Sequence, residues 1–456
     1  MKVVIVGGSD AGVSAALRIK ELEPSFDVLI VTKDHYPNFS VCGLPYLHSG
    51  EIKDFTSLFH RTPKDLEALQ INLQLDTEVS MIDSAKCLVV TSHGDEIAYD
   101  TLILGTGVLP RKLPVLDDLQ SPSVFYLHSP CDGERLETYI RKKHPRSALV
   151  IGAGYIGVEM AEAFATRGIS SYLIERNDQI FPSAEVSHSN RIQEALEAKG
   201  VKVYTSCGVK TASKTEDTKV SITLTNQEAL EVDIVIVAIG VLPNSTLAQA
   251  AGLASDAQGA IVVDHHMRTS DPRILAAGDV VHTFHRILQR FAYLPLGSTA
   301  HKQGAIAGEV AAGSVAHEFK GSVGTQVLKV FENVFATTGI KLAQSLHEGY
   351  DPVLVEIEAD DHKAYYPGAK KIFLSLLGDK ITGKLLGVQM YARTTAAVHK
   401  RIDVAATALY NDMTVADLLD LDLSYNPPLG SPWDPLQVAA AEWLRKTATF
   451  KASSQR

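Results

Sequence analysis

The chain has 456 residues, with 53 Asp and Glu against 43 Lys and Arg, so its formal net charge is −10. This length predicts about three domains, which can bury their cores without disulfides or metals. The acidic balance argues against nucleic acid or an anionic membrane as the main partner, and we expect neither.

The four cysteines are spread along the chain, and no two of them form a CxxC pair. This pattern is typical of neither a disulfide framework nor a zinc site, so we expect no metal. Free cysteines in a long chain fit a reducing compartment. The chain starts with a strand that runs directly into a glycine turn, unlike a signal peptide, and it has no apolar run of about 18 residues. We therefore expect a cytoplasmic protein.

Residues 2–32 follow the order strand, glycine turn, helix, strand, which predicts a βαβ unit of a parallel sheet. The turn, Gly7-Gly8-Ser9-Asp10-Ala11-Gly12, is a loose form of G-x-G-x-x-G with Ser9 at the middle glycine position. An acid often stands about 20 residues further on to bind a ribose, but Thr32 and Lys33 stand there. The ribose contact is therefore left open. The apolar runs 87–90 and 101–107 are predicted to close this unit.

Residues 147–175 repeat the pattern about 145 residues later, which predicts a second nucleotide-binding unit. Here Gly152, Gly154 and Gly157 form a complete G-x-G-x-x-G, whose glycines permit a tight turn and a close approach to a pyrophosphate. Glu175 follows at the end of the next strand, where a carboxylate accepts from a ribose 2′-hydroxyl and favours NAD. Arg176 beside it favours a 2′-phosphate, so NADH and NADPH both stay open.

The order of later segments predicts that the second unit is inserted into the first. The run 232–244 closes the second unit, whereas 274–280 and the helical stretch 298–313 return to the first. From about Gly324, strand-like runs and then helices predict a separate α+β domain. We therefore expect an α/β protein with two Rossmann-like dinucleotide-binding domains and a C-terminal α+β domain. The predicted boundaries are 1–112 with 250–323, 113–249, and 324–456.

Cys42 lies in Asn38-Phe39-Ser40-Val41-Cys42-Gly43-Leu44-Pro45-Tyr46, soon after the first βαβ unit. With this motif and the two glycine turns, the chain resembles the pyridine nucleotide–disulfide oxidoreductases of the single-cysteine type. These include coenzyme A disulfide reductases, NADH oxidases, NADH peroxidases and persulfide reductases. Further shared motifs are Thr106-Gly107 before Pro110-Arg111, Ala238-Ile239-Gly240 before Pro243-Asn244, Ala277-Gly278-Asp279, Tyr365-Tyr366-Pro367-Gly368, and Tyr425-Asn426-Pro427-Pro428.

The resemblance implies FAD at the first glycine turn and NADH or NADPH at the second. Asp279 matches an aspartate that bonds the ribityl chain, and Tyr155 and Glu159 match residues at the nicotinamide face of the flavin. The cofactor-binding residues that it implies are Gly7, Gly8, Ser9, Ala11, Gly12, Thr32, Lys33, Ser40, Val79, Thr106, Gly107, Arg111, Gly152, Gly154, Tyr155, Ile156, Gly157, Glu159, Glu175, Arg176, Gly240, Gly278, Asp279 and Ala300.

The resemblance also implies that Cys42 is the redox-active group, held against the flavin. A thiolate is the reactive form, and Cys42 has no nearby cysteine with which to form an internal CxxxxC disulfide. It therefore cycles with an external partner: a small disulfide such as coenzyme A disulfide, a persulfide, a polysulfide, or oxygen through a sulfenic acid. The resemblance further implies a homodimer, in which Tyr425 and Tyr365 or Tyr366 reach the partner subunit's cysteine and act as general acids.

Three functions remain open. An FAD-dependent NAD(P)H disulfide or persulfide reductase is our first hypothesis, and an NADH oxidase that reduces O₂ is the alternative. A redox-sensing flavoprotein with incidental turnover is a third. Asp10 stands where related peroxidases carry a His, which argues against a peroxidase. Glu21 stands in a place that is often basic in coenzyme A disulfide reductases, although Arg18, Lys20 and Arg61 remain, and Trp433 is unusual for the pattern.

Overall fold

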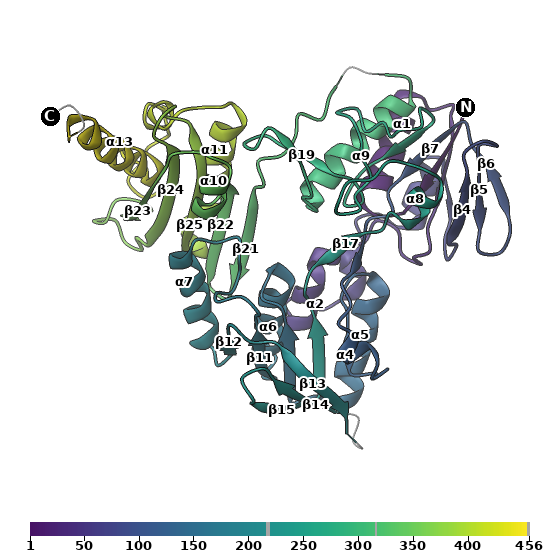
Figure 1. Ribbon diagram of the computed structural model, residues 1–456, viewed down its shortest axis with the longest axis horizontal. Helices are drawn as coiled ribbons and strands as arrows, with labels where there is room; N and C mark the ends of the chain where they lie inside the picture. Colours follow the sequence, from purple (N-terminus) through teal and green to yellow (C-terminus); the bar gives the residue numbers. More distant parts are fainter. Residues whose placement is uncertain (216–218, 315–316, 454–456) are drawn as a thin grey trace. The chain divides into compact units, whose positions relative to one another are not determined.

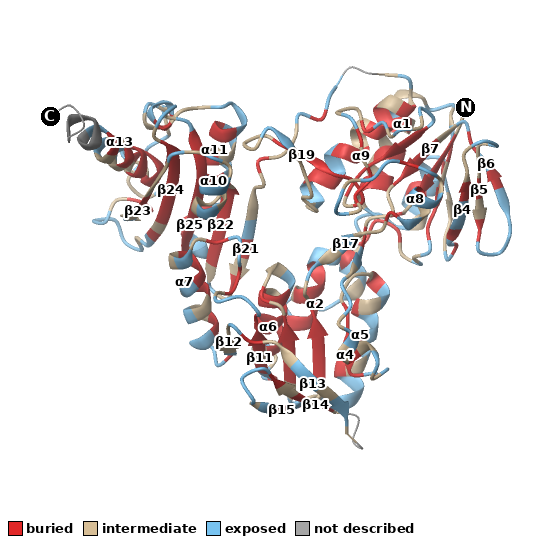
Figure 2. Cartoon of the chain, in the orientation of Figure 1, coloured by how far each residue is buried: buried red, intermediate tan, exposed pale blue. Residues whose placement is uncertain are grey.

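The first glycine turn follows the central strand of a five-stranded parallel sheet, in a computed structural model that describes residues 1–215, 219–314 and 317–453 (Figure 1). The strands lie in the order β18-β7-β1-β2-β3. Their bounds are Ile274–Ala276 (β18), Thr101–Leu104 (β7), Lys2–Val6 (β1), Asp27–Val31 (β2) and Ile71–Gln74 (β3). Their apolar, mostly β-branched residues are buried on both faces, as in a parallel sheet covered on both sides (Figure 2).

The pairing of β18 with β7 confirms that the chain returns to the first unit after the second glycine turn. The prediction that the run 87–90 is a strand is right, but the strand belongs to a different sheet from the one predicted. Leu88–Thr91 (β5) lies between Val79–Asp83 (β4) and Glu96–Ala98 (β6) in a separate antiparallel sheet. Four β-prone residues fit either kind of sheet, and the short turns on both sides of β5 decide for the antiparallel one.

Helix α1 (Asp10–Leu22) packs against α9 (Gly297–Ala311) through backbone contact. A Cβ on Gly304 would lie 2.2 Å from the carbonyl oxygen of Ala11, and a Cβ on Gly308 would lie 2.4 Å from that of Ala15. Glycines four residues apart therefore let the two helices touch along one turn of each. This contact sets the position of α1, whose first residues carry the glycine turn.

The remaining elements of this part of the chain connect the sheets. They are η1 (Val41–Gly43), α2 (Leu44–Ser49), η2 (Phe55–Leu58), α3 (Pro63–Ala68), β8 (Val108–Pro110), α4 (Pro114–Asp117), β9 (Val124–Phe125), α5 (Pro130–Lys143), β17 (Val241–Pro243), α8 (Thr246–Ala250), β19 (Thr283–His285) and β20 (Arg290–Ala292). Strand β17 pairs antiparallel with β8, so the predicted run 232–244 is divided between two sheets.

The second glycine turn belongs to another five-stranded sheet, ordered β12-β11-β10-β16-β9. Its elements are β10 (Ser147–Ile151), α6 (Tyr155–Thr166), β11 (Ser170–Ile174), α7 (Val186–Glu197), β12 (Lys202–Tyr204) and β16 (Ile234–Val237). An antiparallel sheet of β13 (Val209–Lys214), β14 (Val220–Leu224) and β15 (Ala229–Val232) follows β12 in the chain. The register of β10 with β11 runs from Ser147 opposite Ser170 to Ile151 opposite Ile174.

The C-terminal part is an antiparallel sheet with helices, as predicted. Its strands lie in the order β21-β22-β25-β24-β23. Their bounds are Gln326–Val330 (β21), Asn333–Gly339 (β22), Leu385–Arg393 (β25), Lys371–Asp379 (β24) and Pro352–Asp360 (β23). The helices are α10 (Leu342–His347), η3 (Thr394–Ala396), α11 (Val398–Tyr410), α12 (Val415–Leu419) and α13 (Pro435–Ser453). Strands β22 and β25 and helices α11 to α13 share one apolar core.

The described chain forms two compact units. The first comprises Met1–Pro145, Ile236–Phe284 and Arg290–Gly321; the second comprises Arg146–Val235, His285–Gln289 and Ser322–Arg456. The fold class is as predicted, with two Rossmann-like sheets and a C-terminal α+β part. The three predicted domain boundaries stay a prediction.

The contact of α1 with α9 predicts that Gly308→Ala lowers the thermal unfolding temperature. Alanine is the better helix former by about 1 kcal/mol, but its Cβ has no room against the Ala15 carbonyl, and overpacking costs about 1–3 kcal/mol. Gly208→Ala is the matched control, since its Cβ would meet only Thr225, at 3.9 Å. We expect the control to unfold at the wild-type temperature, and an equal effect of both variants contradicts the role given to the contact.

Candidate active site

The first glycine turn is closed too tightly for side chains. Gly7 has a φ of +115°, and a Cβ there would lie 2.1 Å from the oxygen of Gly105. A Cβ on Gly12 would lie 1.9 Å from the oxygen of Gly7. Ser9 caps α1 with extended backbone, and its side chain makes no capping hydrogen bond. The turn thus presents backbone N–H groups and the positive end of a 13-residue helix, a combination that suits a phosphate.

Thr32 ends β2 beside this turn. Its side chain is buried and meets the place where a Cβ of Gly8 would stand, at 3.0 Å. Its hydroxyl accepts a hydrogen bond from the Asp34 N–H at 3.3 Å, whereas Lys33 is exposed. The structure therefore puts a packed hydroxyl, not a carboxylate, at the position where a ribose acid is usual.

Asp279 lies at the carboxyl side of β18, next to the same helix. Gly278 before it has a φ of +84°, and a Cβ there would lie 2.8 Å from the Cβ of Ala11 and 3.6 Å from that of Ala300. The side-chain carboxylate of Asp279 accepts no hydrogen bond from the described residues. Burial, and then the charge of Asp10, raises the pKa of Asp279 to about 6.

Four residues that the sequence analysis did not predict complete this corner. Tyr293 donates to the main-chain oxygen of Asp279 at 3.0 Å, and the Gly278 N–H donates to Gln303 Oε1 at 3.0 Å. His301 Nε2 lies 3.3 Å from Asp10 Oδ1, and its Nδ1 lies 2.9 Å from the Ser14 hydroxyl. His301 and Gln303 belong to the predicted helical stretch 298–313, but no sequence motif marked any of the four. The contacts of His301 with Asp10 and Ser14 join segments almost 300 residues apart.

Cys42 is an exposed thiol on a rigid turn. It lies in η1, and a Cβ on Gly43 would lie 2.2 Å from Leu58 Cδ2, so the turn is fixed against η2. The Ser40 N–H donates to the Leu58 oxygen at 2.8 Å. Beneath the turn lies an apolar cluster formed by Phe39, Leu44, Leu47 and Leu58, with Tyr36, Ile52, Phe55 and Phe59 packed against it. This packing fixes the backbone at Cys42 and leaves the residue exposed.

Helix α2, which follows Cys42, is tied to α5 by a buried polar contact. His48 Nδ1 lies 3.3 Å from Glu137 Oε2, and Glu137 also accepts from Arg141 Nε at 3.0 Å. Gly133 on α5 allows the close approach, because a Cβ there would lie 2.3 Å from Leu44 Cδ2. The position of the thiol thus depends on residues about 90 positions further along the chain.

The paired strands β8 and β17 bring four more predicted residues together. Thr106 donates from its hydroxyl to the Asn244 oxygen at 2.7 Å, and the Asn244 N–H donates to the Gly107 oxygen at 2.9 Å. The Arg111 N–H donates to the Gly240 oxygen at 2.9 Å. Val79 lies apart from them, buried at the start of β4.

The second glycine turn, in the other unit, is closely packed at Gly157 and open at Gly154. A Cβ on Gly157 would lie 1.8 Å from the Gly152 oxygen, whereas a Cβ on Gly154 would meet nothing within 4 Å. Glu175 is buried, and its carboxylate accepts from the Ala153 and Asn177 N–H groups, both at 2.9 Å. Arg176 and Ile156 are exposed.

Tyr155 starts α6 at this turn. Its ring meets Phe181 edge-on, with centroids 4.5 Å apart, and its buried hydroxyl finds no hydrogen-bond partner among the described residues. Burial, and then the charge of Glu159, raises the pKa of Tyr155. The phenol is therefore a neutral donor with nothing in the described chain to donate to.

The three candidate tyrosines of the C-terminal part lie on two adjoining loops. Tyr365, Tyr366 and Tyr425 are 73%, 45% and 47% exposed. The loops are joined by the Lys363 N–H, which donates to the Pro427 oxygen at 3.2 Å. A side-chain hydrogen bond with Tyr425 raises the pKa of Tyr365, whereas Tyr366 turns to His362, with ring centroids 5.9 Å apart.

Comparison with known proteins matches residues 1–304 to the pyridine nucleotide-disulphide oxidoreductase model and residues 326–435 to the dimerisation domain of the same family. The chain belongs to this family. It is 33% identical over 441 residues to the NAD(P)H coenzyme A polysulfide/persulfide reductase of Pyrococcus horikoshii, which covers 96% of this chain and 97% of the relative. It is 30% identical to the NADH oxidase of Methanocaldococcus jannaschii, over 98% of this chain and 99% of the relative.

Among solved structures, the NAD-dependent persulfide reductase from A. fulgidus matches with a TM-score of 0.94 and 33% identity, over 99% of this chain and 84% of that one. The prediction of an oxidoreductase that uses FAD and NAD(P)H is confirmed by these matches. In the described part of the chain, no helix is long and apolar enough to cross a membrane. The roles of single site residues stay predictions.

The raised pKa of Asp279 predicts how Asp279→Asn changes stability with pH. The folded pKa of about 6 lies above the ordinary value of 3.8, so the native carboxyl holds its proton more tightly, and wild-type stability falls as the pH rises from about 4 to 6. Asparagine removes this loss.

In flavin-free protein, we therefore expect Asp279→Asn to match the wild type near pH 4. Above pH 7 it should gain about 3 kcal/mol of unfolding free energy. Thermal unfolding between pH 4 and pH 8 measures the difference. A difference that is constant across this range contradicts the assignment of the buried charge, and Asp118→Asn, at an exposed position directly after α4, is the control.

Proposed function

We propose that this protein is an FAD-dependent enzyme in which NAD(P)H reduces a small disulfide, persulfide or polysulfide through Cys42. The observation that carries the proposal is the exposed Cys42 on a fixed turn, in the same compact unit as the first glycine turn. The relative from Pyrococcus horikoshii is named as a coenzyme A polysulfide/persulfide reductase, and an acceptor of that class suits a cysteine that belongs to no CxxxxC motif.

The residues of the first unit fit FAD. The N–H groups at Gly8, Ser9 and Ala11 would bind the pyrophosphate, because glycines at 7 and 12 leave the turn no other shape. The Asp279 carboxylate, which accepts no hydrogen bond within the described chain, would accept from ribityl hydroxyls. That bond would favour the ionised carboxylate and offset the effect of burial on its pKa.

The remaining predicted residues would line the rest of the FAD site. Thr32 and Lys33 would flank the adenosine ribose, and Val79 the adenine. The others proposed for FAD are Gly7, Gly12, Ser40, Thr106, Gly107, Arg111, Gly278 and Ala300.

The second unit would bind the pyridine dinucleotide. Gly154 leaves space at the turn for a pyrophosphate, and Glu175 lies where a ribose 2′-hydroxyl can donate to it. Since the backbone already holds this carboxylate in place, NADH is the proposed donor, with Arg176 free to turn to a 2′-phosphate. Tyr155, at the start of α6, would contact the nicotinamide end of the dinucleotide. Gly152, Ile156, Gly157, Glu159 and Gly240 would complete this site.

Bound FAD accepts a hydride from NAD(P)H and supplies two electrons to sulfur. The Cys42 thiolate attacks one sulfur of R–S–S–R, forms a Cys42–S–S–R mixed disulfide and releases one RS⁻. Two electrons then return Cys42 to the thiolate and release the second RS⁻. Each departing thiolate takes a proton, so a phenol near the sulfur is useful as a general acid.

We propose that the phenol comes from the C-terminal domain of a second copy of the chain, in a homodimer. The family's dimerisation domain covers residues 326–435, which include Tyr365 and Tyr425. Their mutual hydrogen bond favours this pair over Tyr366. The proposed domains are residues 1–112 with 250–323 for FAD, 113–249 for NAD(P)H, and 324–456 for dimerisation.

An NADH oxidase is the second candidate. It is favoured by the relative of that name in Methanocaldococcus jannaschii and by the exposure of Cys42, which would pass through a sulfenic acid during O₂ reduction. The two candidates differ in their electron acceptor. A disulfide or persulfide reductase turns over fast under argon with a sulfur acceptor, whereas an oxidase turns over fast under air without one.

The proposal predicts that Cys42→Ser abolishes NADH-dependent reduction of coenzyme A disulfide and of polysulfide. It should leave the rate of flavin bleaching by NADH within about threefold of wild type, because the serine removes the sulfur and not the nucleotide sites. Stopped-flow absorbance measures both steps. Cys131→Ser, another exposed cysteine, is the control and should keep both rates. Full disulfide reductase activity in Cys42→Ser contradicts the proposal.

The tyrosine pair predicts a graded series. Tyr425→Phe and Tyr365→Phe should each lower kcat for disulfide reduction by about 10²-fold, the lower end of the usual loss of a general acid. Tyr366→Phe should stay within threefold, because Tyr366 contacts His362 and not the pair. Flavin bleaching by NADH is the internal control for all three. A larger loss in Tyr366→Phe than in Tyr365→Phe means that the pair is wrongly chosen.

A further inference from the structure

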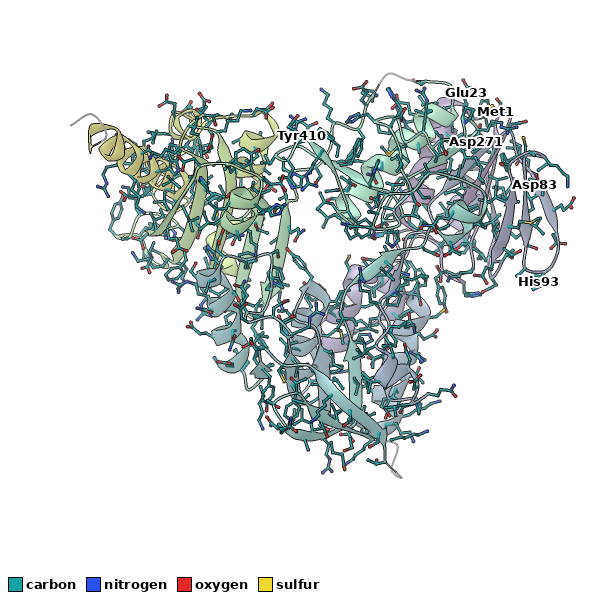
Figure 3. All side chains as sticks on the ribbon, in the orientation of Figure 1. Met1, Glu23, Asp83, His93, Asp271 and Tyr410 are labelled. Carbon is teal, nitrogen blue, oxygen red and sulfur yellow. The ribbon has the colours of Figure 1, made fainter. Side chains whose placement is uncertain are left out.

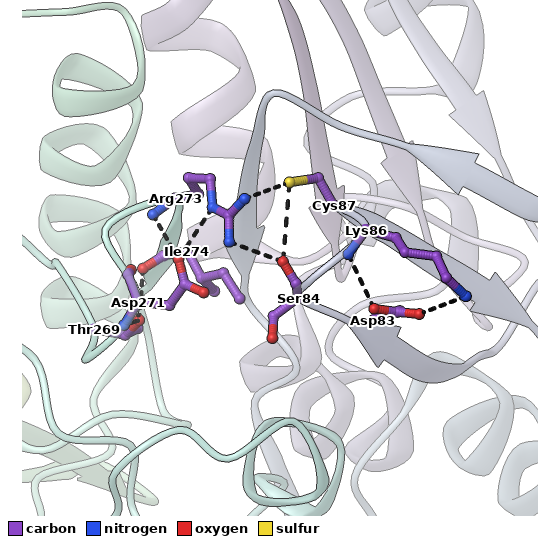
Figure 4. A network of polar contacts seen from close by, with 8 residues as sticks. All are labelled: Asp83, Ser84, Lys86, Cys87, Thr269, Asp271, Arg273 and Ile274. Carbon is purple, nitrogen blue, oxygen red and sulfur yellow. Dashed lines mark hydrogen bonds and ion pairs between the residues drawn. The ribbon is translucent and has the colours of Figure 1, made fainter.

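A second thiol, that of Cys87, lies against an arginine side chain in the first unit. Cys87 is the last residue of the turn between β4 and β5. The Arg273 guanidinium donates from Nη1 to Cys87 Sγ at 2.6 Å and from Nη2 to the Ser84 oxygen at 2.8 Å (Figure 4). Guanidinium has no acceptor, so the sulfur accepts this bond. A cationic donor thus lies directly against the Cys87 sulfur.

The arginine is fixed in place by the loop before β18. The Arg273 Nε lies 3.5 Å from Asp271 Oδ1, and the backbone N–H of Arg273 donates to the same oxygen at 2.9 Å. Asp271 is held by Thr269, whose hydroxyl accepts from the Asp271 N–H at 3.1 Å. Asp83 and Asp271, labelled in Figure 3, mark the two segments that meet here. The hydrogen bond to Asp271, and then the charge of Cys87, raises the pKa of Arg273.

A buried phenol faces the same cluster. Tyr99 is 4% exposed, and its hydroxyl makes no hydrogen bond with any residue that the structure describes. Its N–H donates to the Cys87 oxygen at 2.9 Å. Burial, and then the charge of Cys87, raises the pKa of Tyr99 to about 12, so the phenol keeps its proton. The cluster thus combines a half-buried sulfur, a cation and an unused donor.

Cys131, another cysteine on the surface of this unit, has different surroundings. Cys131 is exposed, but burial of its sulfur and then the charges of Asp34 and Glu134 raise its pKa. Accessibility alone therefore ranks Cys131 above Cys87 for reaction with a disulfide, whereas electrostatics ranks Cys87 first. Comparing the reaction rates of Cys87 and Cys131 therefore separates the effect of neighbouring charge from the effect of accessibility.

We propose that Cys87 is a site of reversible S-thiolation by low-molecular-weight disulfides, separate from the redox-active Cys42. The Cys87 thiolate attacks one sulfur of R–S–S–R, so a Cys87–S–S–R bond forms and the R–S–S–R bond breaks. The electron pair of the broken bond leaves with the departing sulfur as RS⁻, which takes a proton from water. Cys87 is thus oxidised to a mixed disulfide, and the released half of R–S–S–R is reduced to RSH. Tyr99 is placed to donate a hydrogen bond to the sulfurs, and Arg273, released from the thiolate, faces the group that has been added.

The test uses full-length, FAD-loaded protein with Cys42→Ser, so that the flavin-linked thiol does not react. The probe is oxidised glutathione at pH 7, with acid quenching and peptide mass spectrometry at each time point. We expect glutathione on Cys87 at least 10 times faster than on Cys131, and complete removal by excess dithiothreitol. A Cys87 rate equal to or below that of Cys131, or an adduct that dithiothreitol does not remove, overturns the proposal.

Two further variants test the arginine and the phenol. Arg273→Gln should slow Cys87 about 10-fold and leave Cys131 unchanged, whereas Lys86→Gln, which removes a neighbouring cation that pairs with Asp83, should change Cys87 less than twofold. Tyr99→Phe should slow Cys87 about threefold, and it replaces Arg273→Gln as the deciding variant if that protein does not fold. An unchanged Cys87 rate in the deciding variant, or an equal loss in Lys86→Gln, overturns the proposal.

Discussion

The first nucleotide site depends on backbone lying directly against backbone. Three contacts leave no space for a Cβ: Gly7 against Gly105, Gly12 against Gly7, and Gly304 against Ala11. Together they fix the start of α1 relative to β1, β7 and α9. Every polar group that the site uses, from the N–H groups of the turn to the Asp279 carboxylate, takes its position from this packing. A substitution at any of these glycines thus changes the shape of the site before it changes its chemistry.

Local patterns predicted the parts of the site that are made from consecutive residues. The two glycine turns, β2 after the first and Glu175 after the second were readable because spacing within one βαβ unit fixes their positions. The corner formed by Asp10, Ser14, His301 and Tyr293 was not, because α9 approaches α1, and Tyr293 approaches Asp279, only through the fold. The strand 88–91 shows the same limit, since its residues predict a strand but not its partners.

The environments of the cysteines show why sequence context alone separates them poorly. Cys42 was recognised by its motif, whereas Cys87 and Cys131 stand in no recognisable motif. The structure puts a guanidinium from 186 positions away against Cys87, and carboxylates near Cys131. Thiol reactivity follows the charge that surrounds the sulfur, and here that charge comes from tertiary contacts.

The charged residues of α1 bear on the choice of electron acceptor. Arg18, Lys20 and Arg61, the three cations that could bind the phosphates of coenzyme A, all contact other residues of the chain. Arg18 lies 2.8 Å from Glu21 and 3.4 Å from Glu309, Lys20 donates to the Pro24 and Phe26 oxygens, and Arg61 donates to Asn38.

An acceptor with phosphates has to displace these partners, and Glu309 resists displacement because it is buried and also pairs with His317. A small acceptor such as inorganic polysulfide meets no such competition. The contacts around α1 are therefore what an acceptor with phosphates competes with, whereas an acceptor recognised by its sulfur alone does not meet them.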